Sequence, residues 1–141
     1  MSGGNKVRIV GSFSIRSDLD EQTIQGVLGT KCDSFVIAGP KRTPPRAQPL
    51  SNGWILHNKR REIALEGDIE AYVLEFASRL PNGEVAIREL KSLTSNLEVS
   101  IQFSVLGCNP SLFLALSPSS VAWLNQWCAE FGIEFVDLPD D

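Results

Sequence analysis

Residues 13–29 read FSIRSDLDEQTIQGVLG, and this stretch carries the strongest structural pattern in the chain. Apolar and polar residues alternate over residues 7–16, which is the period of a strand with one buried face. Asp18 or Asp20 then offers a side-chain cap for a helix, and Gly29 fits its C-terminal stop. The apolar residues of this helix recur at helical spacing and are Leu19, Ile24, Val27 and Leu28.

A second stretch, residues 113–132, reads FLALSPSSVAWLNQWCAEFG and follows the same order of strand, serine, helix and glycine. Ser117 supplies a hydroxyl cap, and Pro118 stands where a helix needs no amide donor. We expect Gly132 to end this helix and a last strand to follow at residues 133–136. The inner stripe predicted for the helix consists of Val121, Leu124, Cys128 and Phe131.

Between these two stretches the pattern predicts more strands and helices. Apolar or alternating runs predict strands at residues 34–38, 54–57, 97–105 and 112–116. Helical spacing predicts a helix over residues 68–80, capped by Asp68 and ended by Pro81. A shorter helical piece follows, with an apolar set made of Val85, Ile87, Leu90 and Leu93.

This order of elements predicts an α+β fold. We expect a ferredoxin-like (split βαβ) sheet of about six strands, with three main helices forming one layer on the sheet. The 141 residues suit a single domain, residues 1–141, with its core at about residues 7–138.

Composition favours a cytoplasmic protein that is not in a membrane. No apolar run approaches the roughly 20 residues of a membrane span, and the first residues lack the apolar core of a signal peptide. Cys32, Cys108 and Cys128 are an odd set without close spacing, so we expect buried, reduced thiols and no disulfide framework.

The positive charges are concentrated in one region, although the net charge is −4. Residues 39–53 read GPKRTPPRAQPLSNG, a loop with four prolines and two glycines. Six of the thirteen basic residues lie between Pro40 and Arg61 with no acid among them: Lys41, Arg42, Arg46, Lys59, Arg60 and Arg61. This basic loop is either a solvated surface or a site for a ligand or nucleic acid, although the acidic balance argues against a general nucleic-acid binder.

Catalytic and metal-binding patterns are missing from the sequence. The only histidine is His57, no nucleophile elbow occurs, and one histidine with three scattered cysteines does not make a zinc site. We therefore expect no catalytic residues, no metal and no cofactor. The alternative that stays open is an enzyme whose site is assembled in space around His57.

Two tryptophans, Trp123 and Trp127, stand four residues apart and form a ridge on the predicted final helix. They are either part of the margin of the core or include an anchor for a partner, since exposed tryptophan commonly marks a binding hot spot.

Three segments together resemble the bacterial family known as domain of unknown function 4279. They are residues 13–29, the basic loop as it ends in Asn52-Gly53-Trp54, and the closing LSPSSVAWLNQWCAEFGIEFVDL of residues 116–138. The continuation after the first Leu-Gly, residues 30–32, matches that family only loosely. The resemblance covers residues 7–138 and implies no catalytic residue.

What the resemblance implies is a small bacterial protein of the immunity type, paired with a secreted toxin. We therefore expect a non-catalytic immunity or antitoxin protein that binds and neutralises one cognate toxin domain, such as a nuclease with a basic cleft. The residues expected to contact it are Glu66, Glu70, Glu75, Trp123 and Trp127. The alternative is a ligand- or nucleic-acid-binding module that uses the six basic residues between Pro40 and Arg61.

Overall fold

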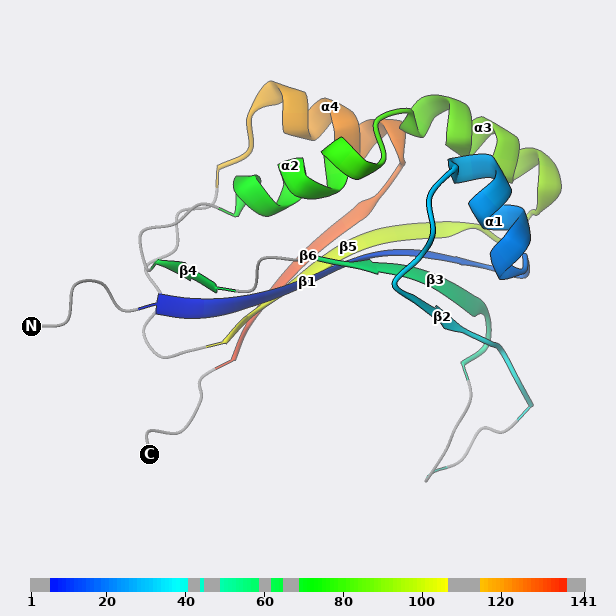
Figure 1. The fold of residues 1–141 in the computed structure, drawn as a ribbon, viewed down its shortest axis with the longest axis horizontal. Coiled ribbons are helices and arrows are strands. Elements are labelled where there is room, and N and C mark those ends of the chain that lie inside the picture. Colours follow the sequence, from blue (N-terminus) through cyan, green and yellow to red (C-terminus); the bar gives the residue numbers. More distant parts are fainter. Residues whose placement is uncertain are drawn as a thin grey trace, which may run out of the picture.

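The computed structural model describes residues 6–40, 44, 49–58, 62–64, 69–106 and 115–136. These residues form a mixed open sheet with four helices, all on one face of the sheet (Figure 1). In chain order the elements are β1 (Lys6–Ser17), α1 (Glu21–Leu28), β2 (Ser34–Val36), β3 (Asn52–His57), β4 (Glu62–Ala64), α2 (Glu70–Arg79), α3 (Gly83–Leu93), β5 (Glu98–Leu106), α4 (Pro118–Gln126) and β6 (Glu130–Val136).

The long strand β1 organises the sheet, whose main path runs β2-β3-β1-β5-β6. β1 pairs antiparallel with β3 on one side and with β5 on the other, and the short β4 pairs with the first residues of β1. β3 lies between β1 and β2 and is antiparallel to both. β6 is parallel to β5, and α4 lies between these two strands in the chain. The predicted α+β class is confirmed, and the ferredoxin-like order and the number of strands stay predictions.

One face of the sheet is buried under the helices because the strands alternate apolar and polar residues. Phe13 is fully buried at the centre of this core. Its ring centroid lies 6.4 Å from that of Phe76 on α2, 5.9 Å from that of Trp123 and 5.1 Å from that of Trp127. Aromatic rings from β1, from α2 and from the α4 region therefore meet at one point, which fixes the helix layer on the sheet.

The predicted helix starts at both similar stretches are confirmed, and so is the stop of the first helix at Gly29. Asp20 caps α1 by accepting a 2.8 Å hydrogen bond from the backbone N–H of Thr23. Hydrogen bonds with the side chain of Thr23, and then with its backbone, lower the pKa of Asp20. Gly29 ends α1 in the left-handed conformation, with φ of 69°. Ser117 caps α4, and Pro118 is its first residue. Of the two possible caps for α1 the chain uses Asp20.

The predicted end of the last helix is wrong. α4 stops at Gln126 instead of continuing to Gly132, and Cys128 turns the chain with φ of 52°. Phe131 consequently belongs to β6. The buried residues of this region are Ser120, Trp123, Leu124 and Trp127, whereas Val121 and Cys128 are exposed. Leu124 from the predicted stripe is buried, and the two indoles are buried in place of Val121 and Cys128. Both indole N–H groups donate to the backbone carbonyl of Leu80, at 2.8 Å from Trp123 and 3.4 Å from Trp127.

α3 corrects the prediction of three main helices. At 11 residues it is longer than α2, which has 10. Ala86, Ile87 and Leu90 form its buried stripe, while Val85 and Leu93 from the predicted set are about half exposed. Two other predictions are not tested, because Asp68, the predicted cap, and most of the strand predicted at residues 112–116 lie outside the described residues.

In the described ranges, no helix has the length and hydrophobicity that a membrane span requires.

Candidate functional site

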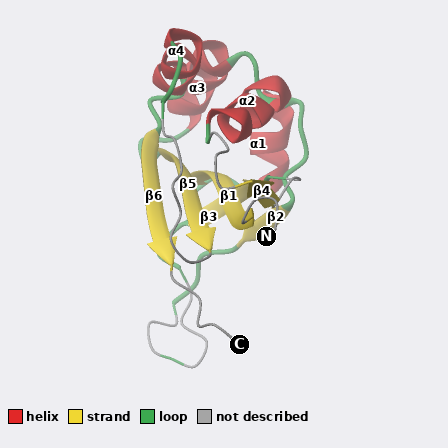
Figure 2. Ribbon diagram, turned by 90° about the vertical axis from the view of Figure 1, so that its left-hand side faces the viewer, coloured by secondary structure: helices red, strands yellow, loops and turns green. Residues whose placement is uncertain are grey.

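In the described ranges, no helix covers the face of the sheet opposite the helix layer (Figure 2). Side chains at alternate positions of β1 lie on this helix-free face, from Arg8 at one end to Arg16 at the other. Its middle carries Ser12 and Ser14 on β1 and Ser100 and Ser104 on β5, with the larger Gln102 between the last two. Such a surface can donate and accept hydrogen bonds.

The β5–β6 half of this face is acidic. Glu130 and Glu134 are exposed on β6, and the register places them beside Ser100 and Ser104 of β5. The hydroxyl of Ser104 donates a 2.8 Å hydrogen bond to Oε1 of Glu134. The two carboxylates are four residues apart on one strand, so both point to the same side of the sheet. We call Glu130 and Glu134 the β6 carboxylates.

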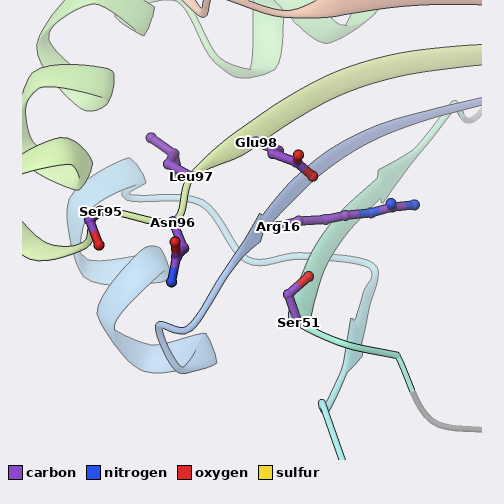
Figure 3. Close-up of a pocket in the computed structure, with 6 residues that line it drawn as sticks. All are labelled: Arg16, Ser51, Ser95, Asn96, Leu97 and Glu98. Atoms are coloured by element: carbon purple, nitrogen blue, oxygen red, sulfur yellow. The ribbon is translucent and has the colours of Figure 1, made fainter. Parts of the chain in front are cut away.

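A groove opens at one end of the face, where β1 ends and β5 begins (Figure 3). Its first part is a hollow of about 260 Å³ lined by Arg16, Ser51, Ser95, Asn96, Leu97 and Glu98. A second hollow of about 410 Å³ shares Arg16, Ser51 and Glu98 with the first. Apolar side chains line the rest of the second hollow: Val36, Pro49, Leu50 and Ile55. We call the two hollows together the Arg16 groove.

Local hydrogen bonds hold the walls of this groove in place. Asn52 is the main tie, because its Nδ2 donates to the carbonyl of Leu19 at 2.9 Å and its Oδ1 accepts from the N–H of Ala38 at 2.8 Å. The N–H of Gly39 donates to the carbonyl of Pro49 at 3.3 Å. The segments that leave β2 and enter β3 are therefore joined to each other and to the segment before α1.

The floor of the groove holds two opposite charges. Arg16 and Glu98 are direct partners in the register of β1 and β5, and both are exposed. In the described ranges ion pairs join Arg79 to Asp33 and Arg88 to Glu84, and none joins Arg16 to Glu98. In Figure 3 the Arg16 side chain extends away from its strand, with Glu98 on one side and Ser51 on the other. Both charged groups are thus open to a ligand.

His57 lies on the helix-free face as well, with a hydroxyl next to its ring. Its Nε2 lies 3.2 Å from Oγ of Ser34 on the neighbouring strand. The only carboxylate with a bond to this residue in the described part of the chain is Asp33, which accepts from the backbone N–H at 2.7 Å instead of from the ring. Arg79 completes the cluster, 3.5 Å from Asp33 and 3.1 Å from the carbonyl of His57. A catalytic triad needs an acid that accepts a hydrogen bond from the imidazole ring. Asp33 instead bonds to the backbone of His57, and together with Arg79 it links the start of β2 to β3 and α2.

The residues predicted to contact a partner do not form one exposed surface. Glu70 is engaged in the fold, because its Oε1 accepts hydrogen bonds from the N–H of Ser117 and from the hydroxyl of Ser120. Trp123 and Trp127 are only 6% and 1% exposed. Glu75 is half-buried on α2, and Glu66 lies outside the described residues. Their role in partner binding stays a prediction, and we carry none of them into the surface proposed below.

The alternative basic site also stays a prediction. All six of its residues, Lys41, Arg42, Arg46, Lys59, Arg60 and Arg61, lie outside the described residues. The ends of the basic loop are described, and Pro49 to Ser51 line the Arg16 groove. The prediction of buried thiols is wrong for Cys128, which is exposed. Cys32 is half-buried, and burial raises its pKa, while Cys108 lies outside the described residues.

Arg16, Glu98 and the β6 carboxylates are the residues that reasoning from the sequence missed. The alternation that predicts the buried faces of the two long strands also places Arg16 and Glu98 on the opposite faces. It does not give the register that makes them neighbours. Glu130 was missed because it lay inside a helix that was predicted too long.

Across the described ranges, no group of three histidine, cysteine or acidic side chains is placed to hold a metal ion. Comparison of the chain with protein-family models, with curated proteins and with solved structures gives no match.

Proposed function

We propose that this chain is a non-catalytic binding protein that receives a protein partner on the β5–β6 half of its helix-free face. The observation that carries the proposal is the position of the β6 carboxylates, exposed on one face of a strand beside a floor of serines. Charged side chains on a polar surface suit recognition of another macromolecule, because they steer it by electrostatics and fix its register.

The partner we propose is a basic protein domain, and the specific form of the proposal is an immunity protein that masks a cognate toxin. Two arguments support it. The β6 carboxylates are complementary to a positively charged surface, such as the cleft of an enzyme that acts on nucleic acid. The immunity type is what the sequence resemblance described above implies, and no family model matches the chain.

Charge reversal tests the surface. The partner is captured from a lysate of the native host with the tagged chain, identified, purified and titrated by calorimetry. The double variant Glu130→Lys with Glu134→Lys is compared with Glu84→Lys with Glu89→Lys, which places the same charges on exposed positions of α3. We expect the β6 variant to lose affinity by about tenfold or more, because like charges across an interface cost several kcal/mol.

Both variants must unfold at similar temperatures, since Glu134 also accepts a hydrogen bond from Ser104. The proposal of this surface is wrong if the β6 variant keeps wild-type affinity. It is also wrong if the α3 variant loses as much affinity as the β6 variant. The immunity form is tested by adding the wild-type chain to the purified partner, whose toxic activity should stop at equimolar chain.

A further inference from the structure

The Arg16 groove has no role in the proposal above, yet its chemistry is specific. It combines a cation, an anion and an apolar wall in one hollow. At about 410 Å³ the larger part lies within the range of small-molecule sites, which is roughly 300–1,000 Å³.

The two charges are close enough to contact one small molecule. Side chains directly opposite each other on antiparallel strands start from Cβ atoms roughly 4.5–5.5 Å apart. Arg16 and Glu98 have this relationship, and they are not joined by an ion pair within the described residues. A ligand with a single negative charge would meet repulsion from Glu98, and one with a single positive charge would meet repulsion from Arg16. A ligand that carries both charges on adjacent atoms satisfies both side chains.

The wall beside these charges is suited to a hydrocarbon group. Leu50 is 82% exposed and Val36 is 40% exposed, so both have apolar surface that a ligand would remove from water. Gly53 is the other cross-strand partner of Arg16 and has no side chain to fill the floor. Ser51 adds a hydroxyl at the point where the charged and apolar parts meet.

We propose that the Arg16 groove binds a small zwitterion with an apolar side chain, namely a free aliphatic α-amino acid. The ligand's carboxylate accepts hydrogen bonds from the Arg16 guanidinium, whose planar fork suits two carboxylate oxygens. Its ammonium donates to the carboxylate of Glu98. Its alkyl group lies against Val36, Leu50 and Ile55. Neither Glu130 nor Glu134 lines the groove, so its ligand and the protein partner would contact different side chains, although Glu130 lies beside Ser100, two positions along β5 from Glu98.

Calorimetric titration with three related molecules tests the proposal. Leucine has both charges, isocaproate lacks the ammonium, and isoamylamine lacks the carboxylate, while the hydrocarbon part is nearly the same. We expect leucine to bind at least tenfold more tightly than either analogue, because hydrogen bonds to charged groups are each worth about a tenfold factor or more.

Two variants with matched controls assign the charges. Arg16→Met should weaken leucine binding at least tenfold and remove the preference for leucine over isoamylamine, whereas Arg8→Met, at the far end of the same face, should change nothing. Glu98→Gln should remove the preference for leucine over isocaproate, whereas Glu89→Gln, an exposed change on α3, should keep it. The proposal is overturned if leucine does not bind, if it binds no more tightly than both analogues, or if Arg16→Met leaves its affinity unchanged.

Discussion

The carboxylate of Glu70, the first residue of α2, holds the beginning of α4. Its Oε1 atom accepts hydrogen bonds from the backbone N–H of Ser117 and from the hydroxyl of Ser120. These residues are 47 and 50 positions away in the chain, so the contact joins two helices of the layer that are far apart in sequence. An acid at a helix N-terminus also interacts favourably with the helix dipole.

This contact predicts a dependence of stability on pH. Hydrogen bonds with Ser117, and then with Ser120, hold the pKa of the Glu70 carboxyl below its usual value. Because the pKa is lower in the folded state, the ionised group stabilises the fold above the pKa of the unfolded chain, and this contribution disappears as the pH falls through the folded pKa.

We therefore expect Glu70→Gln to lower the free energy of unfolding at neutral pH. When the pH falls below the usual glutamate pKa, the free energy of unfolding of this variant should drop by less than that of the wild type. Chemical denaturation over a pH series measures this. Glu89→Gln, an exposed change on α3, is the control and should follow the wild-type profile. Equal acid sensitivity of the Glu70→Gln variant and the wild type would contradict the capping role.

Substitution of alanine for glycine should have opposite effects on stability at Gly83, which lies against Trp127, and at Gly26, which has free space around it. A Cβ atom at Gly83 would lie 2.4 Å from Nε1 of Trp127, a rigid ring that is fully buried. Gly83→Ala should therefore destabilise the protein by roughly 1–3 kcal/mol, as overpacking does. Gly26→Ala should stabilise it by roughly 0.5–1 kcal/mol, since Gly26 is exposed in α1 with nothing within 4 Å of the added atom.

Thermal and chemical unfolding of these two glycine variants measure the difference. If Gly83→Ala is as stable as the wild type, the indole of Trp127 does not lie against α3 in solution. The packing of the region after α4 would then need revision.

Substitution of Ser34 or His57 should not change the affinity for the proposed partner. Both lie on the helix-free face, but β1 and β5 separate β3 from β6. With strands roughly 4.8 Å apart, His57 is about 14 Å from the β6 strand across the sheet. We expect His57→Ala and Ser34→Ala to keep wild-type affinity for the captured partner in calorimetry. A large loss with both variants would move the binding surface toward β3 and would revive an assembled site around His57.

Local signals in the sequence predict much of this fold. Asp20, Gly29 and Ser117 act as caps where the sequence places them, and the alternation in β1 and β5 identifies their buried faces. These features depend on residues near each other in the chain, which is why one sequence is sufficient to predict them.

The errors come from contacts between distant residues. The length of α4 depends on where Trp127 finds space against Phe13 and Leu80, and neither neighbour is visible in the local pattern. Glu70 looks like a solvent-exposed acid at a helix start, and only the packing of α2 beside α4 makes it a cap. The candidate site also depends on a contact between distant residues, because the register of β1 with β5 is what places Arg16 beside Glu98.

Mapping of backbone amide chemical shifts by NMR shows whether the helix-free face near β6 receives a protein partner. The labelled chain is titrated with the captured partner. We expect the largest changes on residues 98–106 and 130–136, with little change in α1, α2 and α3. Changes concentrated on the helices, with β5 and β6 unaffected, would contradict this proposal.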